Sequence, residues 1–263
     1  MQVFVLGAPR SGTTVVGNFI ASHPQCSDLG EYYGFYLTLD QAPRLMQRMP
    51  TPHRDAFLAD LFEASVGFAE RTLIDGRSFW CDHTPHNLLV ASSLVARFPS
   101  AVFILMLRHY RGCIQSLRRS YAEGYPWAGI RFMDSAQLWA DFYERVDALP
   151  PDRTLPVSYD ALCAEPGSEV ERITSFLADR VGVAAAAFDH AIFASSHATK
   201  TSRPTLATTD GATTFFRRKS SFDANAWGDG YEAAAHIHVA PVDALLRKRY
   251  PAVYREATSV PDC

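Results

Sequence analysis

Cysteine is scarce in this chain and irregularly placed. The 263 residues contain five cysteines, at positions 26, 81, 113, 163 and 263, and no two of them form a C-x-x-C pair. An odd number of isolated cysteines argues against a disulfide framework and against a cysteine zinc site. The pattern favours a reducing compartment, and we expect a cytoplasmic protein.

Long apolar runs and a strong net charge are missing as well. No uncharged apolar run approaches the ~20 residues that a membrane helix needs. Arg10 and Gly12 interrupt the first apolar stretch, where a secretory leader would have its apolar core. The 25 Lys and Arg residues nearly balance the 28 Asp and Glu residues. We therefore expect no membrane span and no general binding to nucleic acid.

The remaining composition is that of a folded domain. Hydrophobic residues make up 48% of the chain and charged residues 20%, which excludes general disorder. Neither a fixed-period repeat nor a boundary between domains is visible. We predict a single domain over residues 1–263, in which 195–263 is a lid or closing segment. That segment begins with a stretch rich in Ser, Thr, Gly and Pro, which is typical of a lid.

Strands and helices are predicted to alternate along the chain. Short apolar runs indicate buried strands at Gln2–Leu6, Phe79–Cys81, Ala101–Leu107 and Thr154–Ser158. Helices are predicted at Thr13–Ala21, at 54–73 with an apolar stripe from Phe57 to Phe68, and at Asn87–Phe98, Arg111–Tyr121 and Asp134–Leu149. A capping box over Ser168–Glu171 predicts the start of one more helix. This order predicts a three-layer α/β fold, with a central, mostly parallel sheet flanked by helices.

The most informative motif is GAPRSGTT, residues 7–14, between the first predicted strand and the first predicted helix. In that setting, backbone N–H groups and the helix N-terminus form a concave anion site. The two glycines allow a tight backbone path, and Ser11, Thr13 and Thr14 add hydroxyl donors. The spacing resembles the phosphate loop G-x-x-x-x-G-K-[ST], but Thr13 stands in the lysine position and the basic residue is Arg10.

A second anion site is predicted at the end of the strongest strand. Arg108 follows Ala101–Leu107, and Ser116 comes eight residues later on the next predicted helix. A kinase or ATPase would have an acidic metal ligand at such a strand end, whereas an arginine attracts an anion and repels a metal ion. We therefore expect no metal site. Two anion sites suggest a nucleotide that is phosphorylated at both ends.

These motifs resemble those of sulfotransferases that use 3′-phosphoadenosine 5′-phosphosulfate (PAPS). GAPRSGTT is similar to their 5′-phosphosulfate loop, and RHYRGCIQS, residues 108–116, to their 3′-phosphate element. Further matches follow in the family's order: HPQCSDLGE (23–31), DHTP (82–85) and VSYDALCAEP (157–166). The resemblance implies a P-loop-like α/β domain and metal-free sulfuryl transfer, with adenosine 3′,5′-bisphosphate (PAP) as the second product.

The resemblance also implies which residues bind the nucleotide. They are Arg10, Ser11, Gly12, Thr13, Thr14, Arg108, Ser116, Arg218 and Lys219. Arg10 would contact the bridging oxygen and the 5′-phosphate. Arg218 and Lys219 belong to a basic stretch that, with Trp227, is similar to a segment whose cations close over the 3′-phosphate. Ser220 stands where the family usually has glycine, and a solvated basic stretch is the alternative reading.

A base must take the proton of the acceptor near the sulfur. Glu31 is the first candidate, because relatives with the P-R-S-G-T-T loop have a glutamate at this place. His83 is the second candidate, although relatives usually have lysine in this D-x-T-P segment. His83 could act as an acid, a base or a hydrogen-bond donor, or it could have no role, and Asp82 could orient it. The expected catalytic residues are Arg10, Glu31 and His83.

The acceptor is expected to be a hydroxyl or amine of a small molecule, a carbohydrate or a lipid-like alcohol. Residues 32–49 and the Ser/Thr-rich stretch would line its side of the site, and the aromatic residues at 32, 33, 35 and 36 form either a wall or part of the core. Two alternatives stay open. One is a P-loop kinase, against which the missing loop lysine speaks, and the other is a non-catalytic nucleotide-binding module.

Overall fold

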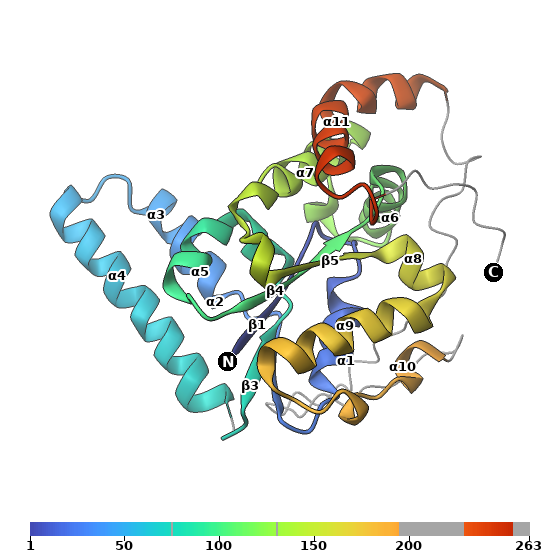
Figure 1. The fold of residues 1–263 in the computed structure, drawn as a ribbon. Coiled ribbons are helices and arrows are strands. Elements are labelled where there is room, and N and C mark those ends of the chain that lie inside the picture. Colours follow the sequence, from blue (N-terminus) through green and yellow to red (C-terminus); the bar gives the residue numbers. More distant parts are fainter. Residues whose placement is uncertain (75, 130, 195–228, 255–263) are drawn as a thin grey trace.

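A five-stranded parallel sheet forms the centre of the protein. The structure is a computed structural model that describes residues 1–74, 76–129, 131–194 and 229–254 (Figure 1). Within these ranges the strands have the order β2-β3-β1-β4-β5, and every neighbouring pair is parallel. Their bounds are β1 Gln2–Leu6, β2 Cys26–Gly30, β3 Phe79–Asp82, β4 Val102–Leu107 and β5 Thr154–Ser158. The predicted α/β fold is confirmed, and β2 is a strand that the sequence analysis missed.

Helices lie on both faces of the sheet. The α-helices are α1 (Thr13–Ala21), α2 (Gly34–Tyr36), α3 (Ala42–Leu45), α4 (Thr51–Phe68), α5 (Ala91–Arg97), α6 (Tyr110–Ala122), α7 (Phe132–Tyr143), α8 (Tyr159–Ala164), α9 (Pro166–Val181), α10 (Ala191–Ala194) and α11 (Asp229–Arg249). The short π turns are η1 (Leu37–Gln41) and η2 (Ala69–Leu73). The 3₁₀ turns are η3 (Pro85–Val90), η4 (Pro126–Ala128), η5 (Val146–Ala148), η6 (Pro151–Arg153) and η7 (Ala185–Ala187).

Two hydrophobic cores sit on the two faces of the sheet, because successive side chains of a strand point to opposite faces. On one face Phe4 and Leu6 of β1 pack with Phe103 and Leu105 of β4, under α2, α5, α6, α7 and α11. On the other face the alternate residues of both strands pack under α1, α8, α9 and α10. All six residues of β4 are buried, which explains why the sequence reads as a continuous apolar run.

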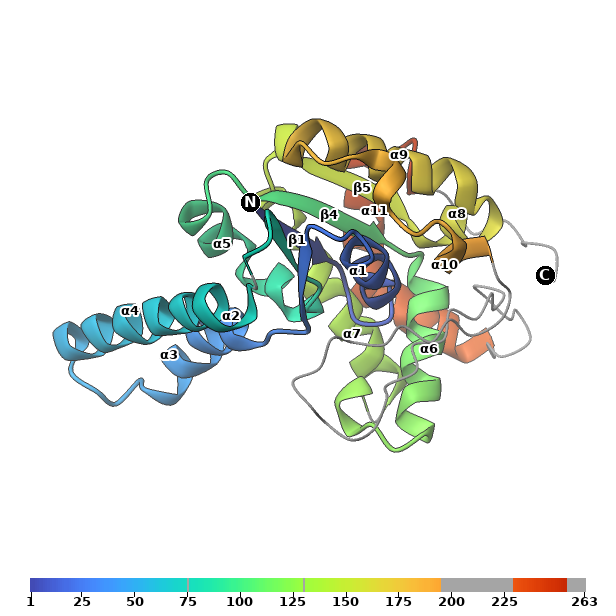
Figure 2. The same ribbon diagram turned by 90° about the horizontal axis from the view of Figure 1, so that it is seen from below.

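Helix α4 stands away from the sheet, and the predicted apolar stripe is only partly buried. The helix contacts α2, η1 and α3 and extends to one side of the body with α3 (Figures 1 and 2). Phe62 and Val66 are buried, but Phe57 is 42% exposed and Phe68 45% exposed. The prediction of a helix is confirmed, and both ends of its apolar stripe stay exposed.

Other helix boundaries also differ from the predictions. The chain over 85–90 is a 3₁₀ turn, so α5 begins only at Ala91, and α7 ends at Tyr143 rather than at Leu149. The capping box at Ser168–Glu171 is wrong. Helix α9 begins at Pro166, and the Ser168 hydroxyl donates to the Glu165 carbonyl oxygen at 3.2 Å. A proline at the first helical position has a pre-set φ, and it starts the helix here.

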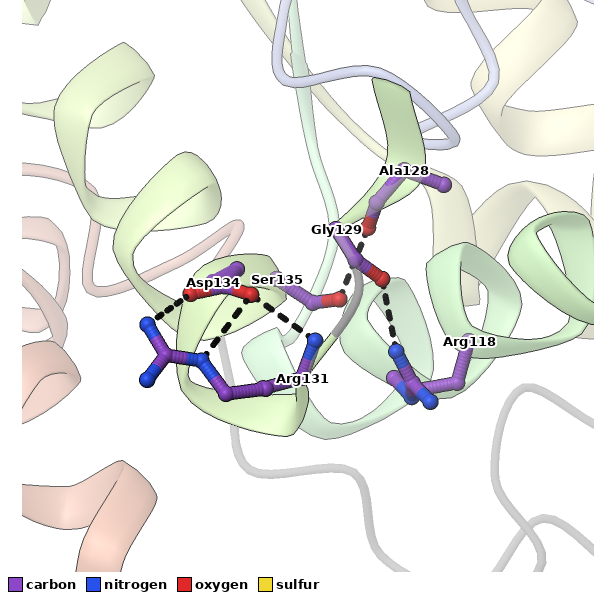
Figure 3. A network of polar contacts seen from close by, with 6 residues as sticks. All are labelled: Arg118, Ala128, Gly129, Arg131, Asp134 and Ser135. Atoms are coloured by element: carbon purple, nitrogen blue, oxygen red, sulfur yellow. Dashed lines mark hydrogen bonds and ion pairs between the residues drawn. The ribbon is translucent and has the colours of Figure 1, made fainter. Parts of the chain in front are cut away.

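A small polar network ties α6 to the start of α7 (Figure 3). Arg118 of α6 donates to the carbonyl oxygen of Gly129 at 2.6 Å, and the Ser135 hydroxyl of α7 donates to that of Ala128 at 2.8 Å. The Asp134 carboxylate accepts from the Arg131 backbone N–H at 2.8 Å and from its guanidinium at 2.9 Å. The Arg118 bond thus links α6, which carries Ser116, to the segment that precedes α7.

Candidate active site

The carboxyl ends of β1 and β4 carry the two predicted anion-binding elements. β1 is the middle strand, and Leu6 at its end pairs with Leu105 of β4. Loops that follow adjacent parallel strands emerge at the same edge of a sheet. The loop after β1 and Arg108 after β4 therefore meet, and the Arg108 guanidinium donates to the carbonyl oxygen of Arg10, 98 positions away in sequence, at 2.7 Å.

Both glycines of the loop occupy places that a side chain would not fit. Gly12 precedes α1 with φ of +99°, and a Cβ there would lie 2.4 Å from Cδ2 of Tyr159. A Cβ on Gly7 would lie 2.5 Å from the Ser11 hydroxyl and 2.8 Å from the Met106 carbonyl oxygen. The loop is thus pressed against β4 and α8, and its path depends on glycine.

The Arg10 side chain is exposed and spans the two anion-binding elements. Its Nε donates to the Ser116 hydroxyl at 3.2 Å. Arg10 itself has φ of +73°, a left-handed conformation that an L-residue adopts at a cost of about 1–2 kcal/mol. Strain of this kind is typical of functional sites. The structure thus brings Arg10, Arg108 and Ser116 together as one connected group.

Tyr159 is a member of this group that the sequence analysis did not assign to the site. It is the first residue of α8, directly after β5, and its ring lies 4.4 Å from the Arg108 guanidinium carbon in a cation–π contact. The edge of the same ring faces Gly12. Tyr159 therefore packs between the loop after β1 and the arginine after β4. Its position directly after a parallel strand is the signal that could have found it.

The three hydroxyls of the loop differ in exposure. Ser11 and Thr13 are buried, whereas Thr14 is half-buried. Thr13 and Thr14 are the first two residues of α1, and the first N–H groups of a helix have no partner within the helix. A ligand at this helix N-terminus would therefore meet open backbone donors and the Thr14 hydroxyl.

Glu31 lies beside the loop. It follows β2, whose last residue Gly30 pairs with Asp82 of β3, and its side chain is exposed. The Thr14 hydroxyl donates to Oε1 of Glu31 at 3.3 Å. Burial raises the pKa of the neighbouring Tyr33 to about 12, and the charge of Glu31 and a hydrogen bond to it add to that shift. The structure thus places an exposed carboxylate beside the loop after β1.

His83 is completely buried against α1. A Cβ on Gly17 would lie 2.3 Å from Cδ2 of His83, so the imidazole fills the space that glycine leaves. Its Nε2 lies 3.7 Å from Oδ1 of Asp28, a residue of β2 that the sequence analysis did not single out. The backbone N–H of His83 donates to the carbonyl oxygen of Gly30 at 3.0 Å. The imidazole thus lies beside the carboxylate of Asp28.

Asp82 is buried and holds the turn that follows β3. Its carboxylate accepts from the Thr84 backbone N–H at 2.8 Å and from the Asn87 side-chain amide at 3.0 Å. Burial raises the pKa of Asp82 to about 7, and the hydrogen bonds from Thr84 and Asn87 oppose that shift. These two hydrogen bonds give Asp82 a structural part in shaping this turn.

The raised pKa of Asp82 predicts a pH-dependent stability. Between pH 3.8 and about 7 the unfolded chain has released this proton and the folded chain still holds it. The free energy of unfolding should therefore fall as the pH rises, by roughly 4 kcal/mol at most. The near-isosteric variant Asp82→Asn should lack this loss, so it gains stability relative to wild type between pH 5 and 8. Urea unfolding of both proteins at several pH values checks this.

The matched control is Asp152→Asn, which changes an exposed carboxylate in η6. It should leave the difference in the free energy of unfolding between pH 5 and pH 8 the same as in wild type. If Asp82→Asn also left that difference unchanged, Asp82 would not be the group that titrates.

Several predicted features lie outside the described residues. Arg218, Lys219 and Trp227 are outside, as is most of the predicted closing segment. Over 1–74, 76–129, 131–194 and 229–254, no cluster of three or more His, Cys, Asp or Glu residues is arranged to hold a metal ion. In the same ranges no helix has both the length and the apolarity to cross a membrane.

The sequence of this chain matches a family of known proteins. The model of the sulfotransferase family matches residues 2–179. A putative protein-tyrosine sulfotransferase of Caenorhabditis briggsae is 25% identical over 191 residues, which cover 66% of this chain and 64% of that protein. Protein-tyrosine sulfotransferase 1 of Danio rerio is 26% identical over 187 residues, which cover 66% of this chain and 52% of that protein. The chain thus spans about half to two thirds of the length of these curated relatives.

A solved structure shows the same fold. Sulfotransferase STF9 from Mycobacterium avium matches with a TM-score of 0.51 and 15% identity, over 96% of this chain and 77% of that one. The family match covers the sheet, the loop after β1, the Arg108–Ser116 element and most of α9. The chain belongs to the sulfotransferase family.

Proposed function

We propose that this protein transfers a sulfuryl group from PAPS to an acceptor hydroxyl. The observation that carries the proposal is the connected group of Arg10, Arg108 and Ser116, in which a phosphate-type loop and a second anion-binding element meet. A nucleotide with phosphate at both its 5′ and 3′ positions matches two such elements side by side. The proposal needs no metal ion, because an arginine stands at the end of β4, where a metal-dependent kinase has a carboxylate.

The groups at the site fit the charge of this donor. Arg10 is exposed and permanently cationic, and α1 presents its N-terminus and the Thr14 hydroxyl at the same place. When bound, PAPS supplies the sulfuryl group, and its 5′-phosphate takes up negative charge as the leaving group. Arg10 stabilises that charge, and Arg108 with Ser116 holds the 3′-phosphate. Fixed donors of this kind lower the barrier because they need no rearrangement during the reaction.

The acceptor side is proposed to lie around Glu31. Glu31 accepts the proton of the acceptor hydroxyl as it attacks sulfur in line. Next to it the rings of Tyr33 and Tyr36 lie near that of His86, with centroid distances to the imidazole of 5.3 Å and 4.9 Å, and all three residues are half-buried. Relatives named as protein-tyrosine sulfotransferases point to protein acceptors. We propose a phenolic hydroxyl, such as that of a tyrosine in a protein, ahead of sugar or lipid-like alcohols.

Calorimetry with PAP and with ATP–Mg²⁺ tests the donor site. We expect PAP to bind, and Arg108→Ala to weaken its binding by about 10–100-fold, because a charge-assisted hydrogen bond to phosphate is lost. The control is Arg119→Ala, an exposed arginine on the same helix as Ser116, which should leave PAP affinity unchanged. Tight binding of ATP–Mg²⁺ alone would favour a kinase. An unchanged affinity of Arg108→Ala for PAP would show that Arg108 does not form a second anion site.

Transfer of labelled sulfate to tyrosine peptides, phenols and sugars tests the acceptor.

A further inference from the structure

Thr14 joins the phosphate loop to the proposed base. It is the second residue of α1, where the helix N-terminus attracts an anion, and its hydroxyl donates to Glu31 across 3.3 Å. Glu31 comes from a different part of the chain, directly after β2. The hydrogen bond therefore ties the carboxylate to the place where the 5′-phosphate of the nucleotide is proposed to bind.

The Thr14 hydroxyl cannot serve both partners at once. A threonine hydroxyl has a single proton to donate, although its oxygen can accept two hydrogen bonds. Both Glu31 and a phosphate accept hydrogen bonds and carry negative charge, so they compete for this proton and repel each other. A phosphate at the helix N-terminus also accepts hydrogen bonds from backbone N–H groups. It therefore competes better than Glu31 for the Thr14 hydroxyl. Tyr33 remains as a second donor to Glu31.

We propose that Thr14 is a positioning residue that holds Glu31 against the phosphate loop until the nucleotide binds, and then releases it. This inference rests on the proposed function, since it assumes a 5′-phosphate at the N-terminus of α1. Once the hydroxyl turns to the phosphate, repulsion moves the carboxylate away from the loop and toward the acceptor side. The acceptor then meets a free base only in a site that already holds the donor.

Carbon-13 NMR of protein labelled at glutamate carboxyl carbons tests the release. The Glu31 signal is identified by its absence in Glu31→Gln. In wild type PAP should shift this signal. In Thr14→Val, which keeps the shape of threonine and removes the hydroxyl, the signal should be displaced in the same direction without any nucleotide. The further shift on adding PAP should be clearly smaller than in wild type. Thr14→Ser should behave like wild type.

The control variant is Thr154→Val, whose hydroxyl donates to the Pro150 carbonyl oxygen at the start of β5. It should leave the Glu31 signal in place. Calorimetry on the same samples separates the two hypotheses. If PAP does not bind wild type, the proposed function fails. If PAP binds, but the nucleotide-free Glu31 signal is the same in Thr14→Val and wild type, the inference about Thr14 is wrong.

Discussion

Replacing Arg10 with alanine is expected to lower kcat/KM for sulfuryl transfer by about 10²–10³, the loss typical of removing one fixed donor at a developing anion. The guanidinium is the exposed cation of the phosphate loop, and its contact with Ser116 places it between the two anion-binding elements. It is the group best situated to stabilise the charge that appears on the leaving 5′-phosphate. Transfer of labelled sulfate at several donor concentrations separates the loss in kcat from that in KM.

The backbone of Arg10 provides a control for folding. Because φ is +73°, Arg10→Gly removes the same side chain and also relieves the left-handed strain. It should be as inactive as Arg10→Ala, yet more stable by about 1 kcal/mol. Arg10→Lys keeps the charge and loses the planar fork, so it should fall between wild type and alanine. Near-wild-type activity in Arg10→Gly would show that the side chain does not take part in transfer.

The strands of this fold could be predicted where burial on both faces leaves no alternative to an apolar run. That holds for β1 and β4, which lie inside the sheet. It fails for β2, whose sequence CSDLG is short and partly polar. β2 is an edge strand with β3 as its single neighbour, and it ends at the site, where Asp28 faces His83. Its polar residue Asp28 contacts a residue from another part of the chain, and such a contact cannot be read from the local sequence.

Helical periodicity predicted α4 but not what the helix packs against. A stripe from Phe57 to Phe68 indicates a helix with an apolar face, and such a face is usually assumed to lie on the sheet. In the structure α4 contacts α2, η1 and α3 instead, and both end phenylalanines stay exposed. Periodicity specifies a face, whereas its partner depends on the length and direction of the preceding connections.

The candidate site could be predicted where its residues belong to one short motif or are separated by one fixed spacing. The loop of residues 7–14 and the separation of Arg108 from Ser116 are of that kind, and the contacts through Arg10 bring both together. Tyr159 was missed because its role comes from topology: β5 pairs with β4, so the residue after β5 lies beside the residue after β4. The burial of His83 was missed because it depends on Gly17 of α1.

Replacing Glu31 with glutamine is expected to lower kcat by about 10²–10⁴, the usual contribution of a general base. The amide keeps the size of the side chain and can still accept a hydrogen bond from Thr14, so the local structure should persist. PAP affinity should be unchanged or slightly higher, because a negative charge near the phosphate loop is removed. Labelled-sulfate transfer to a tyrosine peptide, together with calorimetry of PAP, measures both quantities.

The combination of a lost kcat and a retained affinity for PAP is what distinguishes a base from a structural residue. Glu171→Gln, a change of an exposed glutamate on α9, is the matched control and should alter neither quantity. Glu31→Asp should recover part of the activity, since it restores a carboxylate that is shorter by one methylene. If kcat were unchanged in Glu31→Gln while Arg10→Ala was inactive, the proton would have another acceptor. His86, half-buried and near the rings of Tyr33 and Tyr36, would then be the next residue to replace.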